Sequence, residues 1–196
     1  MKNDELKQLI DDSIFQSSSL ISQSNNFFQT ILKISDLIVK CLKKNNKIVL
    51  FGNGGSASDC DHFATELLGR YQLERKSLAA ISITNSSTIT AIGNDYGFEN
   101  IFSRQCESLV NKDDVVIAIS TSGNSLNVLK GIKLCKKKNA KTIAITGHDG
   151  GNLAELGDIS IIVPSNSTPR IQEVHRLLIH IICDIVERSF IKTNPD

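Results

Sequence analysis

Five short runs of aliphatic and β-branched residues divide this chain, and they limit its fold more than any other feature. The runs are Lys47 to Phe51, Ala79 to Ile83, Val115 to Ile119, Thr142 to Ile145 and Ile159 to Val163. Each is nearly continuous in apolar residues, as expected for parallel strands buried on both faces. Helical patterns follow near residues 58–70, 86–94, 98–110, 125–138, 150–156 and 169–191. This alternation predicts an α/β fold of three layers, with a five-stranded parallel sheet in the order 2-1-3-4-5 between helices.

The region before the first run predicts a helical N-terminal extension. Residues 4–22 and 26–44 read as two amphipathic helices, and in the second Ile31, Ile34 and Ile38 recur at helical spacing. A length of 196 residues suits one domain. We therefore expect a single domain over 1–196, with N-terminal helices in 1–45 and an α/β core in 46–191. The extension suggests a surface for assembly with further copies of the chain.

Composition excludes several classes of protein. The formal charge is +1, so no overall field favours nucleic acid or a membrane as partner. Five cysteines are scattered without a C-x-x-C pattern, which favours a reducing compartment over a disulfide framework. The N-terminus is rich in charge where a signal peptide needs an apolar core, and no apolar run approaches the roughly 20 residues of a membrane span. We expect a cytoplasmic protein.

Two polar loops are expected at the ligand-binding edge of the sheet. In this topology ligands bind beyond the carboxyl ends of the strands, where the strand order reverses between strands 1 and 3. The loops there are Gly52 to Ser58 and Ser120 to Ser125. The second loop is rich in hydroxyl groups and leads into a helix, whose N-terminus favours an anion. It therefore predicts a phosphate site, although an ordinary helix cap would use the same residue types.

The first loop also matches a looser pattern. Gly52-x-Gly54-x-x-Ala57 fits the G-x-G-x-x-G/A signature of dinucleotide binding. That signature also needs an acid at the end of the second strand to hold the ribose. The second strand ends in Ile83, Thr84 and Asn85, so a nicotinamide enzyme is disfavoured.

Two further segments contain candidate catalytic or metal-binding residues. His62 and Glu66 are four residues apart in the helix after the first loop, so they share one face. An imidazole and a carboxylate so placed can bind zinc or transfer protons, but a plain surface pair is the commoner outcome. His180 lies in an apolar stretch of the last helix, where a histidine usually serves packing.

Together these segments resemble a known family. The motifs are GNGGSASDCDHFATELLGRY, AIGNDYGFENIFSRQ, ISTSGNSLNVL, ITGHDGG and RIQEVHRLLIH. They are similar to those of the sugar isomerase (SIS) domain family and, within it, of its phosphoheptose isomerase branch. The resemblance runs from about residue 47 to the last helix. It implies a homotetramer that converts D-sedoheptulose 7-phosphate to D-glycero-D-manno-heptose 7-phosphate, for the heptose of bacterial surface polysaccharide such as lipopolysaccharide or capsule.

The resemblance also implies roles for particular residues. The acid–base pair falls on Glu66 and His180, and the zinc site on His62, Glu66, Gln172 and His180. Arg70 falls where the family has an active-site arginine. The substrate-binding positions are Asn53, Gly54, Gly55, Glu66, Arg70, Asn94, Asp95, Ser120, Thr121, Ser122, Ser125 and Gln172.

Helix geometry raises one difficulty with this set. Gln172 and His180 are eight residues apart, about 12 Å along an ideal helix, so one straight helix can hardly bring both to one metal ion. By helical angle Glu173 aligns better with His180. We hypothesise that the site is completed across a subunit interface or that the helix start is distorted.

Two alternatives to this enzyme stay open. One is a non-catalytic SIS regulator of the replication-initiator-associating type, although Glu66 and His180 are both suited to acid–base work. The other is an isomerase of another sugar phosphate, since loop hydroxyls do not count carbons. The chain also departs from some relatives, with Thr65 in place of a second acid and Pro169 in place of an aspartate.

Overall fold

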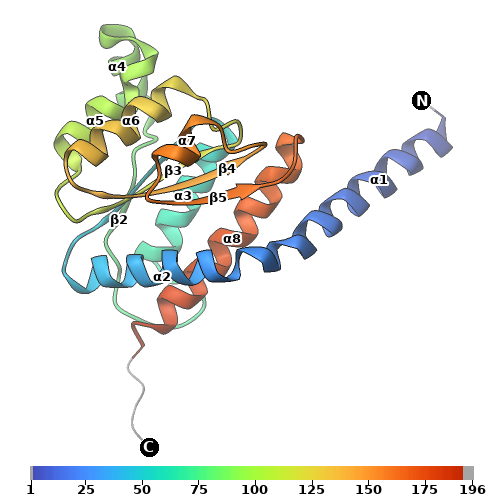
Figure 1. The fold of residues 1–196 in the computed structure, drawn as a ribbon, viewed down its shortest axis with the longest axis horizontal. Coiled ribbons are helices and arrows are strands. Elements are labelled where there is room, and N and C mark those ends of the chain that lie inside the picture. Colours follow the sequence, from blue (N-terminus) through green and yellow to red (C-terminus); the bar gives the residue numbers. More distant parts are fainter. Residues whose placement is uncertain (1, 192–196) are drawn as a thin grey trace, which may run out of the picture.

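The computed structural model describes residues 2–191, and in them strands and helices alternate as predicted (Figure 1). Five parallel strands form one sheet in the order β2-β1-β3-β4-β5. The strands are β1 (Ile48–Gly52), β2 (Ala80–Ser82), β3 (Val115–Ser120), β4 (Lys141–Gly147) and β5 (Ile159–Val163). The predicted fold class and strand order are therefore confirmed.

The helices also follow the predicted pattern, with small changes at their ends. They are α1 (Asn3–Ser22), α2 (Phe28–Lys43), α3 (Gly55–Leu68), α4 (Ser86–Tyr96), α5 (Ile101–Leu109), α6 (Leu126–Lys137), α7 (Gly151–Leu156) and α8 (Thr168–Arg188), with 3₁₀ turns η1 (Gln23–Phe27) and η2 (Phe98–Asn100). The third helix begins three residues earlier than expected, directly at the glycine loop. Within residues 2–191, no helix is both long and apolar enough to cross a bilayer.

The sheet separates two hydrophobic cores. Helices α2, α3 and α8 cover one face, where Ile38, Phe63 and Ile179 are fully buried. Helices α4 to α7 lie along the other face, where Phe51 stacks on Phe102 with ring centroids 5.0 Å apart. Strands β1 and β3 are buried along their whole length, because both faces are covered. The continuous apolar runs of the sequence follow from this double coverage.

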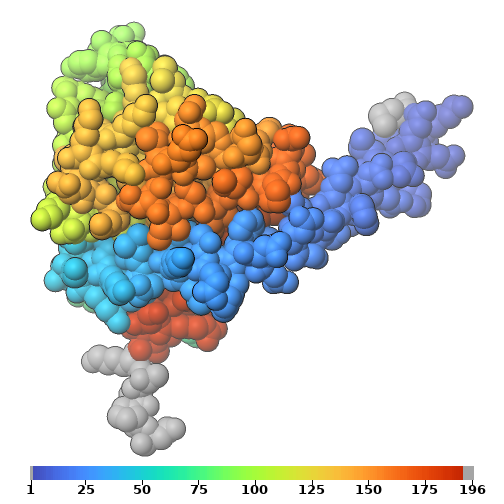
Figure 2. All heavy atoms as spheres, viewed as in Figure 1, coloured from blue at the N-terminus to red at the C-terminus, as the bar shows by residue number. Residues whose placement is uncertain are grey.

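Helices α1 and α2 join through η1 and form a long rod, and α1 extends away from the body of the molecule (Figures 1 and 2). Large apolar side chains are exposed along α1: Leu9, Ile10, Ile14 and Phe15 are 55–72% accessible. The two predicted N-terminal helices are thus confirmed. The single domain over 1–196, divided into 1–45 and 46–191, stays a prediction, and residues 1 and 192–196 lie outside the described residues.

A buried histidine fixes α8 against the sheet. His175 is fully buried, and its Nε2 lies 3.0 Å from the carbonyl oxygen of Thr146 in β4, as a donor in the neutral tautomer. Burial lowers the pKa of His175 to about 4, and the bond to Thr146 opposes this only in part. This residue, three positions after Gln172, is the packing histidine of the helix.

This low pKa predicts a pH-dependent stability. Between about pH 6.5 and pH 4 the unfolded chain binds a proton at His175 that the folded chain does not, so stability falls as the pH falls. The loss from this residue should approach about 3 kcal/mol at pH 4. His175→Gln keeps an amide donor for Thr146 and cannot titrate. Urea unfolding from pH 7 to pH 4 should therefore show a flatter profile for the variant, and identical profiles would contradict the prediction.

Candidate active site

The two polar loops lie side by side at the carboxyl ends of β1 and β3, as the topology predicted. Gly52 is paired in register with Ile119, and a Cβ on Gly52 would lie 2.7 Å from the Ile119 carbonyl oxygen. Beyond the strands, Asn53 and Asn127 exchange two amide hydrogen bonds, each 2.9 Å long. This reciprocal pair joins the two loops without adding a charge. Sequence reasoning missed Asn127, whose only signal is a polar residue in the first turn of a helix.

Three hydroxyl groups of the second loop face one another at the start of α6. Ser120 Oγ lies 3.5 Å from Ser122 Oγ and 3.3 Å from Ser125 Oγ. Ser125 is the N-cap residue of α6, and its side chain makes no capping hydrogen bond. Several hydroxyl groups at a helix N-terminus can donate hydrogen bonds to an anion, whereas a simple helix cap needs only one. Thr121 takes part through its carbonyl oxygen, which accepts a bond from the Gly147 N–H at 3.0 Å.

Gly123 allows this loop to close against the loop after β4. Its φ is +65°, and a Cβ there would overlap the carbonyl oxygen of Gly150. Gly54 in the first loop also has a positive φ, +54°, but has open space around the Cβ position. A side chain at Gly123 therefore meets both backbone strain and a collision, whereas one at Gly54 meets strain alone.

We expect Gly123→Ala to be the more costly of two matched substitutions. Strain at a positive φ should cost Gly54→Ala about 1 kcal/mol of stability. Gly123→Ala should lose about 2 kcal/mol more, because one of the two backbone segments must move. Urea unfolding of both variants measures the difference. Equal losses would show that the contact with Gly150 is loose.

His62, Glu66 and His180 form a cluster between α3 and α8. The Nε2 atoms of His62 and His180 are 2.8 Å apart, and Oε1 of Glu66 lies 3.3 Å from His62 Nε2. One donor atom from each residue lies within 4.8 Å of the other two, and all three side chains are half-buried. Two imidazole nitrogens and one carboxylate oxygen are a donor set typical of catalytic zinc, which has three protein ligands and one open position. The cluster thus fits a metal ion.

A second charged pair borders this cluster. Arg176 Nη2 lies 2.6 Å from Oδ1 of Asp59, whose side chain is buried. Burial raises the pKa of the Asp59 carboxyl, although the charge of Arg176 opposes the shift. Burial and then the charge of Arg176 also lower the pKa of His62, against the opposing effect of Glu66. His62 is therefore neutral near pH 7, the form that can act as a metal ligand.

Tyr71 completes the surroundings of His180. Its ring stacks on the imidazole with centroids 5.6 Å apart and an interplanar angle of 29°. His62 meets the same imidazole edge-on. Tyr71 lies in the loop after α3, and no pattern in the sequence links it to a histidine more than one hundred residues later. Sequence reasoning therefore could not find it.

Gln172 lies near the glycine loop, at the start of α8. Its side-chain amide packs so closely on Gly55, the first residue of α3, that a Cβ on Gly55 would collide with it. Both residues line a hollow of about 550 Å³ with Asp59 and Arg176. Helix α8 begins at Thr168 and continues through Gln172 and His180 as one α-helix. The helix start is therefore not distorted, and a metal-binding role for Gln172 stays a prediction.

Three further predicted residues have their polar contacts outside the cluster. Arg70 is exposed, 3.3 Å from the Gln72 carbonyl oxygen and 4.0 Å from Glu74. Asn94 and Asp95 are exposed on α4, and Asn94 donates a 2.8 Å bond to Asp95. Helix α4 packs on α5 and η2, on the other face of the sheet from α3 and α8. Substrate contacts by these three residues stay predictions.

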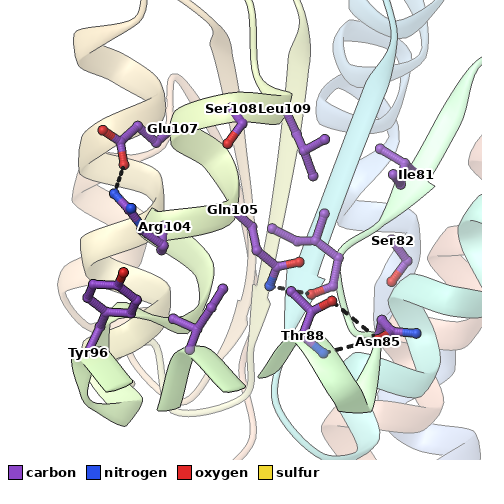
Figure 3. A pocket seen from close by; sticks show the side chains of 12 residues that line it. Ile81, Ser82, Asn85, Thr88, Tyr96, Arg104, Gln105, Glu107, Ser108 and Leu109 are labelled. Atoms are coloured by element: carbon purple, nitrogen blue, oxygen red, sulfur yellow. Dashed lines mark hydrogen bonds and ion pairs between the residues drawn. The ribbon is translucent and has the colours of Figure 1, made fainter. Parts of the chain in front are cut away.

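A larger hollow, of about 790 Å³, lies beside the edge strand β2 and contains none of the predicted site residues (Figure 3). Several of its polar side chains are bonded within the protein. Arg104 pairs with Glu107 at 2.7 Å, Gln105 donates to the Ile83 carbonyl oxygen, and Asn85 caps α4 through the Thr88 N–H. The lining of this hollow has no histidine, and its one acidic side chain, Glu107, is paired with Arg104, so the cluster at α3 and α8 is the better candidate site.

Comparison with known proteins identifies the family of this chain. The family model for the SIS domain matches residues 16–147. A phosphoheptose isomerase from Helicobacter pylori is 50% identical over 191 residues, covering 96% of this chain and 100% of the relative. Phosphoheptose isomerase 1 from Campylobacter jejuni is 47% identical over 183 residues, covering 93% of this chain and 98% of the relative.

Solved structures give the same result. The structure of a phosphoheptose isomerase from Neisseria gonorrhoeae superposes with a TM-score of 0.88 at 38% identity, covering 93% of this chain and 99% of that one. One from Francisella tularensis gives 0.86 at 36% identity, covering 96% and 100%. Sequence and fold agree, and the chain belongs to the SIS domain family, within its phosphoheptose isomerases.

Proposed function

We propose that this protein is an aldose–ketose isomerase that converts D-sedoheptulose 7-phosphate to D-glycero-D-manno-heptose 7-phosphate, for the heptose of bacterial surface polysaccharide. The observation that carries the proposal is the cluster of His62, Glu66 and His180 on α3 and α8, in a chain that also has a hydroxyl-rich loop at the start of α6. A relative of 50% identity over nearly the whole chain is a phosphoheptose isomerase, which supports this substrate.

The reaction needs two proton transfers. A base removes the proton from one of the two carbons C1 and C2 and returns it to the other through an enediolate, while an acid serves the oxygens. Glu66, held 3.3 Å from His62, is the proposed base at carbon. His180, under the ring of Tyr71, is the proposed acid at oxygen or in ring opening. The low dielectric of a half-buried site strengthens the electrostatic interactions of Glu66 and of His180 with the substrate.

Zinc fits this site, one ion per subunit. His62, Glu66 and His180 would hold it, and family resemblance adds Gln172 as a fourth ligand, which on a straight α8 would have to come from a neighbouring subunit. When bound, zinc supplies a Lewis acid that polarises the substrate carbonyl. A carboxylate bound to a cation is a weaker base, so metal binding and proton abstraction compete at Glu66.

The substrate would lie across the two loops. Ser120, Thr121, Ser122 and Ser125 are proposed to hold the phosphate, since their loop combines hydroxyl donors with the start of α6. Asn53, Gly54, Gly55 and Gln172 are proposed to contact the sugar chain between that loop and the cluster. The hollow lined by Gly55 and Gln172 lies between α3 and α8 and supports this path.

We also propose a homotetramer with active sites at subunit interfaces, in the cytoplasm. The exposed apolar residues of α1 support assembly, because an isolated helix does not usually leave such a face in water. In such an assembly Arg70, Asn94 and Asp95 could reach the site of another subunit. Five free cysteines, all buried, are consistent with a reducing compartment.

An assay of aldose–ketose conversion tests the proposal. Purified protein should interconvert the two heptose 7-phosphates, and a chelator should abolish turnover until zinc is restored. Fructose 6-phosphate and ribulose 5-phosphate serve as competing substrates. Turnover of one of these alone would show an isomerase of another sugar phosphate. No turnover of any of them with added zinc would favour a non-catalytic regulator.

A further inference from the structure

A buried ion pair lies behind the cluster and takes no part in the chemistry described above. Glu187, seven residues after His180 on α8, and Arg75, in the loop after α3, have side chains that are 0% and 1% accessible. Arg75 Nε lies 3.4 Å from Glu187 Oε1, an ion pair without hydrogen-bond geometry. Buried charges persist only where other groups satisfy them, so the remaining partners of both side chains show what the pair does.

Arg75 binds the end of the helix that carries Glu66. Its Nη2 donates to the Glu66 carbonyl oxygen at 2.7 Å, and its Nη1 lies 2.9–3.1 Å from those of Leu67, Gly69 and Lys76. The last carbonyl groups of an α-helix have no partner within the helix. The guanidinium group fills this need at the end of α3 and thereby fixes the turn on which Glu66 lies.

Glu187 binds the following loop through its backbone. Its carboxylate accepts three hydrogen bonds of 2.8 Å, from the N–H groups of Tyr71, Gln72 and Leu73. Burial by itself would raise the pKa of the Glu187 carboxyl, but these donors and Arg75 outweigh it and hold the pKa below its ordinary value. Glu187 is therefore ionised at neutral pH, and the first residue it holds is Tyr71, which stacks on His180.

We propose that Glu187 and Arg75 form a positioning clamp that holds Glu66 and His180 at their working separation. The clamp ties the end of α3 to α8 through Arg75, and it sets the ring of His180 through Tyr71. Neither residue touches the reacting atoms. This role rests on the proposed isomerase function, because it concerns the geometry of that acid–base pair.

The main test is Glu187→Gln. A glutamine side chain has an amide group that donates, so it would face backbone N–H groups that also donate. We expect kcat with D-sedoheptulose 7-phosphate to fall at least about 10-fold with KM nearly unchanged, since small misplacements of catalytic groups are costly. The matched control is Asp184→Asn on the same helix, whose partner Arg188 is exposed. That control should behave as wild type.

A spectroscopic measurement separates positioning from loss of folded protein. The chain has only four histidines, so the ring signals of His180 can be assigned by substitution. In the metal-free protein, Glu187→Gln should shift the His180 ring signals in the same direction as Tyr71→Leu, which removes the stacked ring. Tyr71→Phe should keep the wild-type signals. The signals of His148 should stay unchanged throughout.

The outcomes separate clearly. A shifted His180 signal together with reduced kcat supports the clamp. Wild-type His180 signals in Glu187→Gln, or a shift without any loss of kcat, overturn it. Should Glu187→Gln fail to fold, Arg75→Lys takes its place, because a lysine can pair with Glu187 but cannot bind four carbonyl groups. Should wild-type protein show no turnover, the proposed function fails while the His180 signals still decide whether the clamp exists.

Discussion

Glu66→Gln should lower kcat at least about 100-fold with little change in KM, because it removes the proposed base at carbon and keeps the shape of the side chain. Glutamine also keeps an oxygen that can reach a metal ion. Exchange of the substrate C1 and C2 protons with solvent deuterium should therefore stop, even with zinc present. Kinetics and proton exchange, measured on the same sample, check the two expectations together.

The control for this substitution is Glu107→Gln. Glu107 lies on α5, on the other face of the sheet from α3 and α8, with a side chain that is 61% accessible, so its charge should not affect the cluster. If Glu66→Gln keeps activity within a few-fold of wild type, Glu66 is not the base. Zinc binding by the variant should be measured as well, since a loss of the metal could lower activity by a different route.

His180→Ala should have a comparable effect, a loss of at least about 100-fold in kcat, because it removes the proposed acid and one of the three metal donors. The substitution leaves a space beneath the ring of Tyr71, against which the imidazole normally stacks. Free imidazole added to the assay should enter this space and restore part of the activity. A variant with near-normal activity would refute the assigned role.

His175→Gln is the matched control for His180→Ala. Both residues lie on α8, but His175 faces the sheet and bonds to Thr146, away from the cluster. Its replacement should leave kcat at neutral pH unchanged while it changes the pH profile of stability. A large loss of kcat in the control would show that any disturbance of α8 reduces activity, and the result for His180 would then say nothing specific.

Much of the fold could be predicted because its signals are local. The strands are continuous apolar runs, and double coverage of the sheet gives them that composition. The meeting of the Gly52 and Ser120 loops followed from topology, since β1 and β3 are neighbours at the point where strand order reverses. The pairing of His62 with Glu66 followed from helical spacing.

The parts of the site that the sequence did not predict depend on contacts between distant parts of the chain. Tyr71 reaches His180, and Glu187 reaches the loop that carries Tyr71, only because α3 and α8 pack together. Asn127 is a plain helix residue until Asn53 meets it. Roles for Arg70, Asn94 and Asp95 come from resemblance alone, because their hydrogen bonds and ion pairs in the protomer are to other residues than His62, Glu66 and His180. No periodicity or spacing encodes such pairings.

The projecting α1 has a consequence for the energetics of the whole chain. Its outer turns bury little surface against their own protomer, and Arg170 at the start of α8 bonds to the Ser13 carbonyl oxygen, where the rod meets the body. In the proposed tetramer, neighbouring subunits would cover α1, and through the bond between Ser13 and Arg170 the same contact would fix the start of α8. Folding of α1 and association would then be coupled, so the stability of that helix would depend on protein concentration.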